Sequence, residues 1–185
     1  MPRAGLDAEA VVSAAAELAD AEGLEAVTLA GLAKRLGIRS PSLYAHVRGL
    51  DDLRWRIGGR GARELAARLS GEAAGRSGRD ALEAVAHAYR AYAREHPGRY
   101  AALQRAPAER QSEDMQAVVN VVVAVLRGYG IEGKPAIHAV RTIRSALHGF
   151  VSLEAEGGFG MPLSIEESFG HMISVLHRGL EGVAS

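Results

Sequence analysis

This chain of 185 residues lacks several features that would place it in other classes of protein. It has no cysteine, which excludes disulfides and thiolate metal sites and fits the reducing cytoplasm. No N-terminal stretch looks like a signal peptide. The longest apolar run, residues 118–126, contains Asn120 and is too short to cross a bilayer. Since 48% of the residues are hydrophobic, we predict a folded cytoplasmic protein, and we expect no metal and no cofactor.

The chain also lacks net charge, because 22 basic residues balance 22 acidic ones. The charge is nevertheless unevenly distributed. Residues 1–33 contain one basic and six acidic residues, a net charge of −5, whereas residues 34–60 contain seven basic and two acidic residues, a net charge of +5. A local positive patch attracts a phosphate backbone, although a solvated charged face is the alternative. The basic residues of this patch are Lys34, Arg35, Arg39, Arg48, Arg54, Arg56 and Arg60.

Residues 28–47 have the pattern of two short helices joined by a tight turn. Thr28 can cap the first helix, and Gly37 stands where a left-handed residue would end it. Between these two residues, apolar side chains recur at the i, i+3, i+4, i+7 spacing of one helical face. They are Leu29, Leu32, Ala33 and Leu36.

The second helix of this pair is predicted over residues 40–47. Ser40 can cap it, and Pro41 suits its first position, where no amide hydrogen is needed. Leu43 and Val47 are four residues apart and would face the core, so the polar residues between them would face a partner. Two helices joined by a turn of about four residues, the second polar on one side, form a helix-turn-helix.

The first 57 residues or so resemble the N-terminal domain of TetR-family transcriptional repressors. Leu50 stands where family members often have a lysine, and Arg39 stands where a small residue is common. The resemblance implies a three-helix DNA-binding domain over residues 1–57 and a helical effector-binding and dimerisation domain over residues 58–185. The matching segments are residues 6–12, 22–28, 43–48 and 51–53.

The resemblance also assigns DNA contacts to the second helix of the pair and its neighbours. His46 and Arg48 can donate to phosphate oxygens, and an arginine at position 39 could pair with a guanine. Thr28 either only caps its helix or also directs main-chain amides at a phosphate. The predicted DNA-binding residues are Thr28, Lys34, Arg39, Ser40, Ser42, Tyr44, His46 and Arg48.

The rest of the chain predicts further helices, and no stretch reads as a strand, so we expect an all-α fold. The helix predicted over residues 136–156 is apolar on two faces, so its second face needs either a partner chain or cover from its own chain. A homodimer would also place two recognition helices in successive major grooves, roughly 34 Å apart. The interface is predicted at Ile143, Leu147, Phe150, Phe169, Met172 and Leu176.

TetR-like repressors bind a small molecule in the C-terminal domain and then release DNA, so we expect such an effector here. Residues 146–160 are also similar to the Trp-His-Gly type of C-terminal domain, with Leu147 at the tryptophan position. If Arg141 and Arg144 face a cavity, an anionic or carbonyl-bearing effector is favoured. Each candidate could instead be an ordinary core or surface group. The predicted effector-binding residues are His87, Tyr89, Tyr92, Asn120, Arg141, Arg144 and His148.

Two features leave alternatives open. Three glycines in residues 57–62 weaken a helix, so this segment is a hinge, a simple break or a point of close packing. The pairs Glu83/His87 and Glu167/His171 could hold a metal in an enzyme, although such pairs are common on helix surfaces. A DNA-packaging protein would need a basic surface beyond the one positive patch, and the sequence offers no second one. We therefore predict a DNA-binding regulator, most simply a repressor released from a near-palindromic operator by a small molecule.

Overall fold

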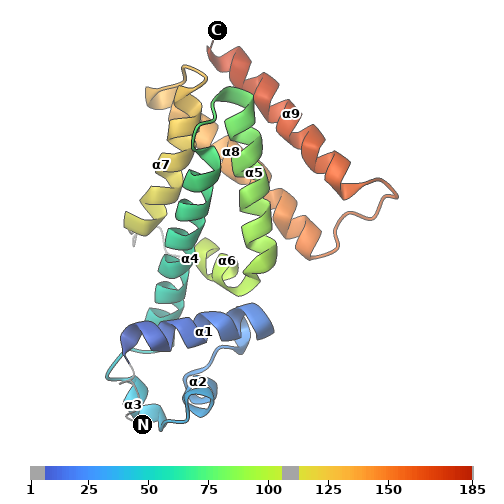
Figure 1. Ribbon diagram of the computed structural model, residues 1–185. Helices are drawn as coiled ribbons and strands as arrows, with labels where there is room; N and C mark the ends of the chain where they lie inside the picture. The colour runs from blue at the N-terminus through green and yellow to red at the C-terminus, as the bar shows by residue number, and fades with distance from the viewer. Residues whose placement is uncertain (1–6, 106–112, 185) are drawn as a thin grey trace. The chain divides into compact units, whose positions relative to one another are not determined.

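The computed structural model describes residues 7–105 and 113–184, so the predicted match at Leu6 lies outside the described residues. The described residues form helices and no strand (Figure 1), which confirms the all-α prediction. None of the helices in these two ranges is long and apolar enough to cross a membrane. The helices are α1 (Ala8–Glu22), η1 (Leu24–Ala26), α2 (Leu29–Leu36), α3 (Ser40–Leu43), α4 (Leu50–Ala73), α5 (Gly78–Glu95), α6 (Pro97–Gln104), α7 (Glu113–Arg127), α8 (Gly133–Ala155) and α9 (Ile165–Ala184).

The chain forms two compact units. The first unit comprises Met1–Glu64 and Glu95–Met115, and the second comprises Leu65–Arg94 and Gln116–Ser185. Helix α4 therefore contributes its first turns to the first unit and its last turns to the second. The functional boundary that we expect between residues 57 and 58 stays a prediction.

The helices of the first unit begin and end at caps, two of which, at Thr28 and Gly37, the sequence predicted. Asp7 Oδ1 accepts a hydrogen bond from the Ala10 amide at 2.7 Å, and Thr28 Oγ1 accepts one from the Gly31 amide at 3.1 Å. Gly37 ends α2 in the left-handed region, at φ 67°. These caps fix where α1 and α2 begin and where α2 ends. The apolar faces meet in a core that includes Val11, Ala15, Leu32, Leu43, Val47, Leu53 and Ile57.

Helix α6 packs against α1 and α4 through glycines. A Cβ atom at position 58 would lie 2.8 Å from the Ala102 carbonyl oxygen, and one at position 61 would lie 3.1 Å from the Arg99 carbonyl oxygen. Helix α4 is continuous through both glycines. Of the three alternatives, a simple break is therefore wrong, and close approach of the α6 backbone accounts for the two glycines.

The second unit has a core formed by α5, α8 and α9. Leu82, Tyr92 and Phe169 are among its most deeply buried side chains. In helix α7 only Val125 and Leu126 are buried, although the helix is rich in valine. Its other valines are half-buried, since a helix with valines all round cannot cover every face against the neighbours present in one chain.

Candidate nucleic-acid interface

The helix-turn-helix is present, but its second helix is shorter than predicted. Helix α3 has four residues, and Arg39 rather than Ser40 precedes it, because the Arg39 carbonyl accepts the first helical bond from the Ser42 amide at 2.9 Å. After α3 the chain continues as a turn, in which Leu43 O accepts from the His46 and Val47 amides. Such a short segment gains little from helical cooperativity, so its shape depends on packing.

The inward and outward faces of this segment follow the prediction. Leu43 and Val47 are completely or almost completely buried, and they attach the segment to the core of the first unit. Tyr44 is 62% exposed, Ser42 and Arg48 are exposed, and His46 is half-buried. The polar side chains are therefore displayed on a surface held in place by two apolar anchors.

The positive patch is smaller than the sequence count suggests, because four of its seven cations form ion pairs. Arg54 lies 2.9 Å from Glu25, and Arg56 lies 3.0 Å from Asp52. Arg35 pairs with Glu17 at 3.8 Å, and Arg60 pairs with Glu9 at 2.8 Å.

Three cations of the patch remain without an ion pair to any carboxylate of residues 7–105 and 113–184. They are Lys34 near the end of α2, Arg39 just before α3 and Arg48 just after it. Their side chains are exposed, and they flank the outward face of α3 in the sequence. We call Lys34, Arg39 and Arg48 the free cations. They are the charges of the patch that remain available to an external polyanion.

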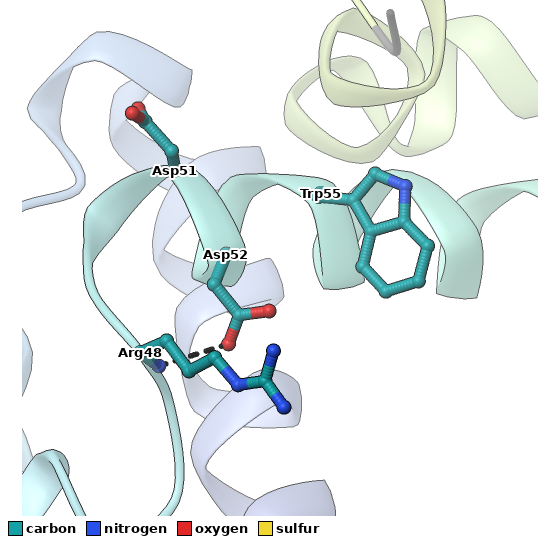
Figure 2. A pocket seen from close by; sticks show the side chains of 4 residues that line it. All are labelled: Arg48, Asp51, Asp52 and Trp55. Atoms are coloured by element: carbon teal, nitrogen blue, oxygen red, sulfur yellow. Dashed lines mark hydrogen bonds between the residues drawn. The ribbon is translucent and has the colours of Figure 1, made fainter. Parts of the chain in front are cut away.

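The start of α4 lies beside one of these cations (Figure 2). The Asp52 carboxylate accepts a hydrogen bond from the main-chain nitrogen of Arg48 at 3.0 Å. The same oxygen accepts another from Nε of Arg56, also at 3.0 Å. Arg48, Asp51, Asp52 and Trp55 line an open hollow of about 340 Å³ at this point.

The predicted effector residues do not share one environment. Tyr89 and Tyr92 are buried, whereas His87, Asn120, Arg141 and Arg144 are exposed. Asn120 lies at the surface of α7, where its Oδ1 accepts a hydrogen bond from Gln116 Nε2. His148 is half-buried, and burial followed by the nearby Arg144 charge lowers its pKa.

Four of the six predicted interface residues are buried in the structure. Ile143, Leu147, Phe150 and Phe169 are buried within their own chain, where they pack in the second unit and are not available to a partner. The alternative that one chain covers these faces therefore applies to them. Met172 and Leu176, by contrast, are half-buried on α9.

Sequence reasoning missed a buried ionic cluster in the second unit. Arg90 is 6% exposed and donates from Nε and Nη2 to the two oxygens of Glu154, at 2.8 and 2.6 Å. Its Nη1 donates to Glu166 at 2.6 Å, and its guanidinium lies 4.6 Å from the ring centre of Phe169. The sequence did contain one signal, an arginine on the otherwise apolar face of α5 beside Ala86, Tyr89 and Ala93.

Comparisons with known proteins agree with this architecture. Residues 11–53 match the model described as "Bacterial regulatory proteins, tetR family", and residues 82–176 match "Tetracyclin repressor-like, C-terminal domain". The chain is 40% identical over 182 residues to the uncharacterized HTH-type transcriptional regulator YobS of Bacillus subtilis (strain 168), covering 97% of this chain and 95% of that protein.

Two further relatives extend the likeness. The chain is 38% identical to the uncharacterized HTH-type transcriptional regulator Rv0681 of Mycobacterium tuberculosis (strain ATCC 25618 / H37Rv), over 96% of this chain and 83% of that protein. The solved structure of a TetR variant from Acinetobacter baumannii AYE in complex with minocycline matches with a TM-score of 0.77 and 23% identity, covering 98% of this chain and 99% of that one. Two matching family models and relatives aligned over nearly the whole chain lead to one conclusion: the chain belongs to the TetR family of bacterial transcriptional regulators.

Proposed function

We propose that the protein is a homodimeric repressor that binds a near-palindromic operator and leaves it when a small-molecule effector binds. The observation that carries the DNA-binding part is the outward face of α3, bounded in the sequence by the free cations. A short polar segment anchored by Leu43 and Val47 can enter a major groove without disturbing the core. Two of the free cations, Lys34 and Arg48, would then neutralise phosphates on either side of it.

The DNA-contacting residues divide into two roles in this proposal. Arg39, at the start of α3, reaches base edges and can make a bidentate pair with a guanine. Lys34 and Arg48 bind phosphates and fix the register, and exposed Tyr44 adds a hydroxyl donor and a flat ring. Thr28 acts through its cap, since its hydroxyl oxygen already accepts the Gly31 amide.

Two copies of α3 require a partner chain, and we place the dimer surface on the exposed sides of α8 and α9. Leu153 on α8 and Val175 and Val183 on α9 are exposed large apolar residues. Gly179 and Gly182 leave open space where a Cβ would stand, so another helix could approach α9 closely. This surface replaces the four buried residues that the sequence suggested.

We place the effector in the second unit. The minocycline complex of a protein with this fold supports a small organic molecule as the kind of ligand. Arg141 and Arg144 are three residues apart on α8 and have exposed side chains, and an anionic or carbonyl-bearing effector is favoured if its site includes them. The effector would favour a shape of the dimer in which the two α3 segments no longer match the groove spacing.

The DNA-binding role can be tested through the salt dependence of binding. The two phosphate-binding cations of each protomer, Lys34 and Arg48, predict a slope of log Kobs against log salt of about −4 for the dimer. Replacing Lys34 with alanine removes two phosphate contacts per dimer and is expected to reduce the steepness of that slope by about 2. The measurement is fluorescence anisotropy of a labelled duplex that carries an operator selected from random duplex DNA.

Arg54→Ala is the matched control, because the Arg54 guanidinium is already paired with Glu25. Its slope is expected to equal that of the wild type. Equal slopes for Lys34→Ala and wild type, or a reduced slope for Arg54→Ala, would contradict the assignment of free and paired cations.

The dimer surface has its own test. Val175→Glu places a charge on an exposed side chain, so the protomer should fold while the dimer dissociates, because a glutamate would have to be buried unpaired in the interface. Sedimentation velocity measures the change in mass. Ala21→Glu, at an exposed position on α1, serves as the control and should remain dimeric. A dimeric Val175→Glu would place the interface elsewhere.

A further inference from the structure

Asp52 occupies an unusual position at the start of α4, because one of its oxygens has two partners. The carboxylate is 18% exposed, and its Oδ2 accepts from the Arg48 amide and from Arg56 Nε, each at 3.0 Å. Asp52 is the third residue of α4, and it reaches back over the helix start to a residue that precedes the helix. A side chain that bonds backwards in this way fixes the direction in which the chain enters a helix.

The turn that carries Arg48 is therefore held at both ends. At its beginning, the Leu43 carbonyl accepts hydrogen bonds from the His46 and Val47 amides at 2.9 and 3.0 Å. At its end, Asp52 holds the Arg48 amide. Gly49 between them has φ 141°, a conformation that L side chains rarely adopt. The main chain at Arg48 is thus fixed by these bonds, although its side chain is exposed.

The second partner of Asp52 affects the charge beside Arg48. A carboxylate next to a free cation would normally cancel much of its attraction for a phosphate. Here the Arg56 guanidinium is already bonded to that carboxylate. Figure 2 shows the Arg48 side chain extending past the Asp52 carboxylate, with the Trp55 indole farther along α4.

We propose that Asp52 is a positioning residue for operator binding, which holds the turn that presents Arg48 to a phosphate, and that Arg56 neutralises Asp52 for this purpose. The inference rests on the proposed function and names two residues that contact no DNA themselves. Arg56 belongs to the positive patch in the sequence, but it acts through Asp52 rather than on the nucleic acid.

The test is a double-variant cycle on the full-length protein, measured by anisotropy with the operator duplex. Asp52→Ala is expected to weaken binding about tenfold, because the Arg48 turn loses a charge-assisted hydrogen bond. Arg48→Ala should weaken it to a similar extent. If Asp52 acts through Arg48, the variant carrying both changes should bind no more than about threefold more weakly than Arg48→Ala alone.

Three comparisons separate positioning from a general loss of stability. The salt slope of the variant carrying both Asp52→Ala and Arg56→Ala, which releases no unpaired arginine, should fall as far as that of Arg48→Ala, because the same phosphate contact is lost. Asp52→Asn keeps an acceptor for the Arg48 amide and should recover part of the affinity. Asp51→Ala, at the exposed neighbouring position, should bind as the wild type does or slightly more tightly.

The outcomes distinguish this inference from the proposed function. Independent, additive losses in the cycle, or an unchanged salt slope for the Asp52→Ala/Arg56→Ala variant, would overturn the positioning role while leaving DNA binding intact. A wild-type protein that binds no duplex at low salt would overturn the proposed function, and the inference would fall with it.

Discussion

Replacing Gly98 with alanine is expected to lower the melting temperature of the protein by roughly 10 °C. A Cβ atom at this position would lie 2.5 Å from the Asp20 amide nitrogen and still closer to the carbonyl group of Ala19. Both neighbours belong to the α1 backbone, so no side-chain rotation can relieve the overlap. The cost of overpacking should therefore reach about 3 kcal/mol or more, at the upper end of what inserted methyl groups cause.

A second alanine substitution provides the control for Gly98→Ala. Gly71 also lies in a helix, but nothing stands within 4 Å of where its Cβ would be. Gly71→Ala should leave the melting temperature unchanged or raise it slightly, because alanine is the better helix former by roughly 1 kcal/mol. Differential scanning calorimetry measures both variants. If Gly98→Ala had the same melting temperature as the wild type, α6 would not pack closely against α1.

Replacing Arg90 with methionine is expected to reduce the free energy of unfolding by about 3 kcal/mol. Methionine keeps an unbranched apolar stem near Phe169 but leaves Glu154 without its bidentate partner. Since the Glu154 side chain is only 16% exposed, water replaces little of the lost interaction. Glu166 contributes less, because its side chain is 63% exposed.

Urea unfolding of three variants, each compared with the wild type, tests this account of the cluster. Arg79→Met changes an exposed arginine in an i, i+4 pair and should cost less than about 0.5 kcal/mol. Changing Glu154 to leucine in the Arg90→Met background removes the unpaired charge and should recover part of the loss. A loss for Arg90→Met no larger than that for Arg79→Met would contradict a buried ionic cluster.

The stability from this cluster should also depend on pH in a definite direction. Arg90 lowers the pKa of Glu154 below its ordinary value of 4.5, mainly through their hydrogen bonds. A depressed pKa in the folded state contributes stability that is present above the unfolded value and is lost as pH falls through the folded value. The difference in stability between wild type and Arg90→Met should therefore be largest near neutral pH and shrink below about pH 4.5. If this difference in stability stays constant below pH 4.5, its source is packing rather than the ion pair.

The features that sequence predicts well in this protein are local. The cap at Thr28 and the left-handed Gly37 depend on residues within one helical turn, and the structure confirms both. The burial of Leu43 and Val47 follows from their spacing in the same way. Such signals suffice to recognise a helix-turn-helix, because the motif is itself a run of neighbouring residues.

The features that sequence could not give depend on distant partners. Arg54 and Glu25 are 29 residues apart, so a count of charges along the chain cannot show that this arginine is already paired. Phe150 and Phe169 lie on apolar helix faces that the sequence assigned to a dimer interface. In the structure, other residues of their own chain bury both side chains. For the same reason the glycines at positions 58 and 61 suggested weakness in α4, when the nearby α6 backbone requires their small size.

Selection of bound sequences from random duplex DNA tests the central claim most directly. If a paired molecule presents the α3 segment twice, the bound sequences should converge on a near-palindrome whose half-site centres are about 10 base pairs apart or a multiple of that spacing. Enrichment should disappear when Lys34 and Arg48 are both replaced by alanine. Recovery of no preferred sequence at low salt, or of a single asymmetric site that survives the double replacement, would contradict the account.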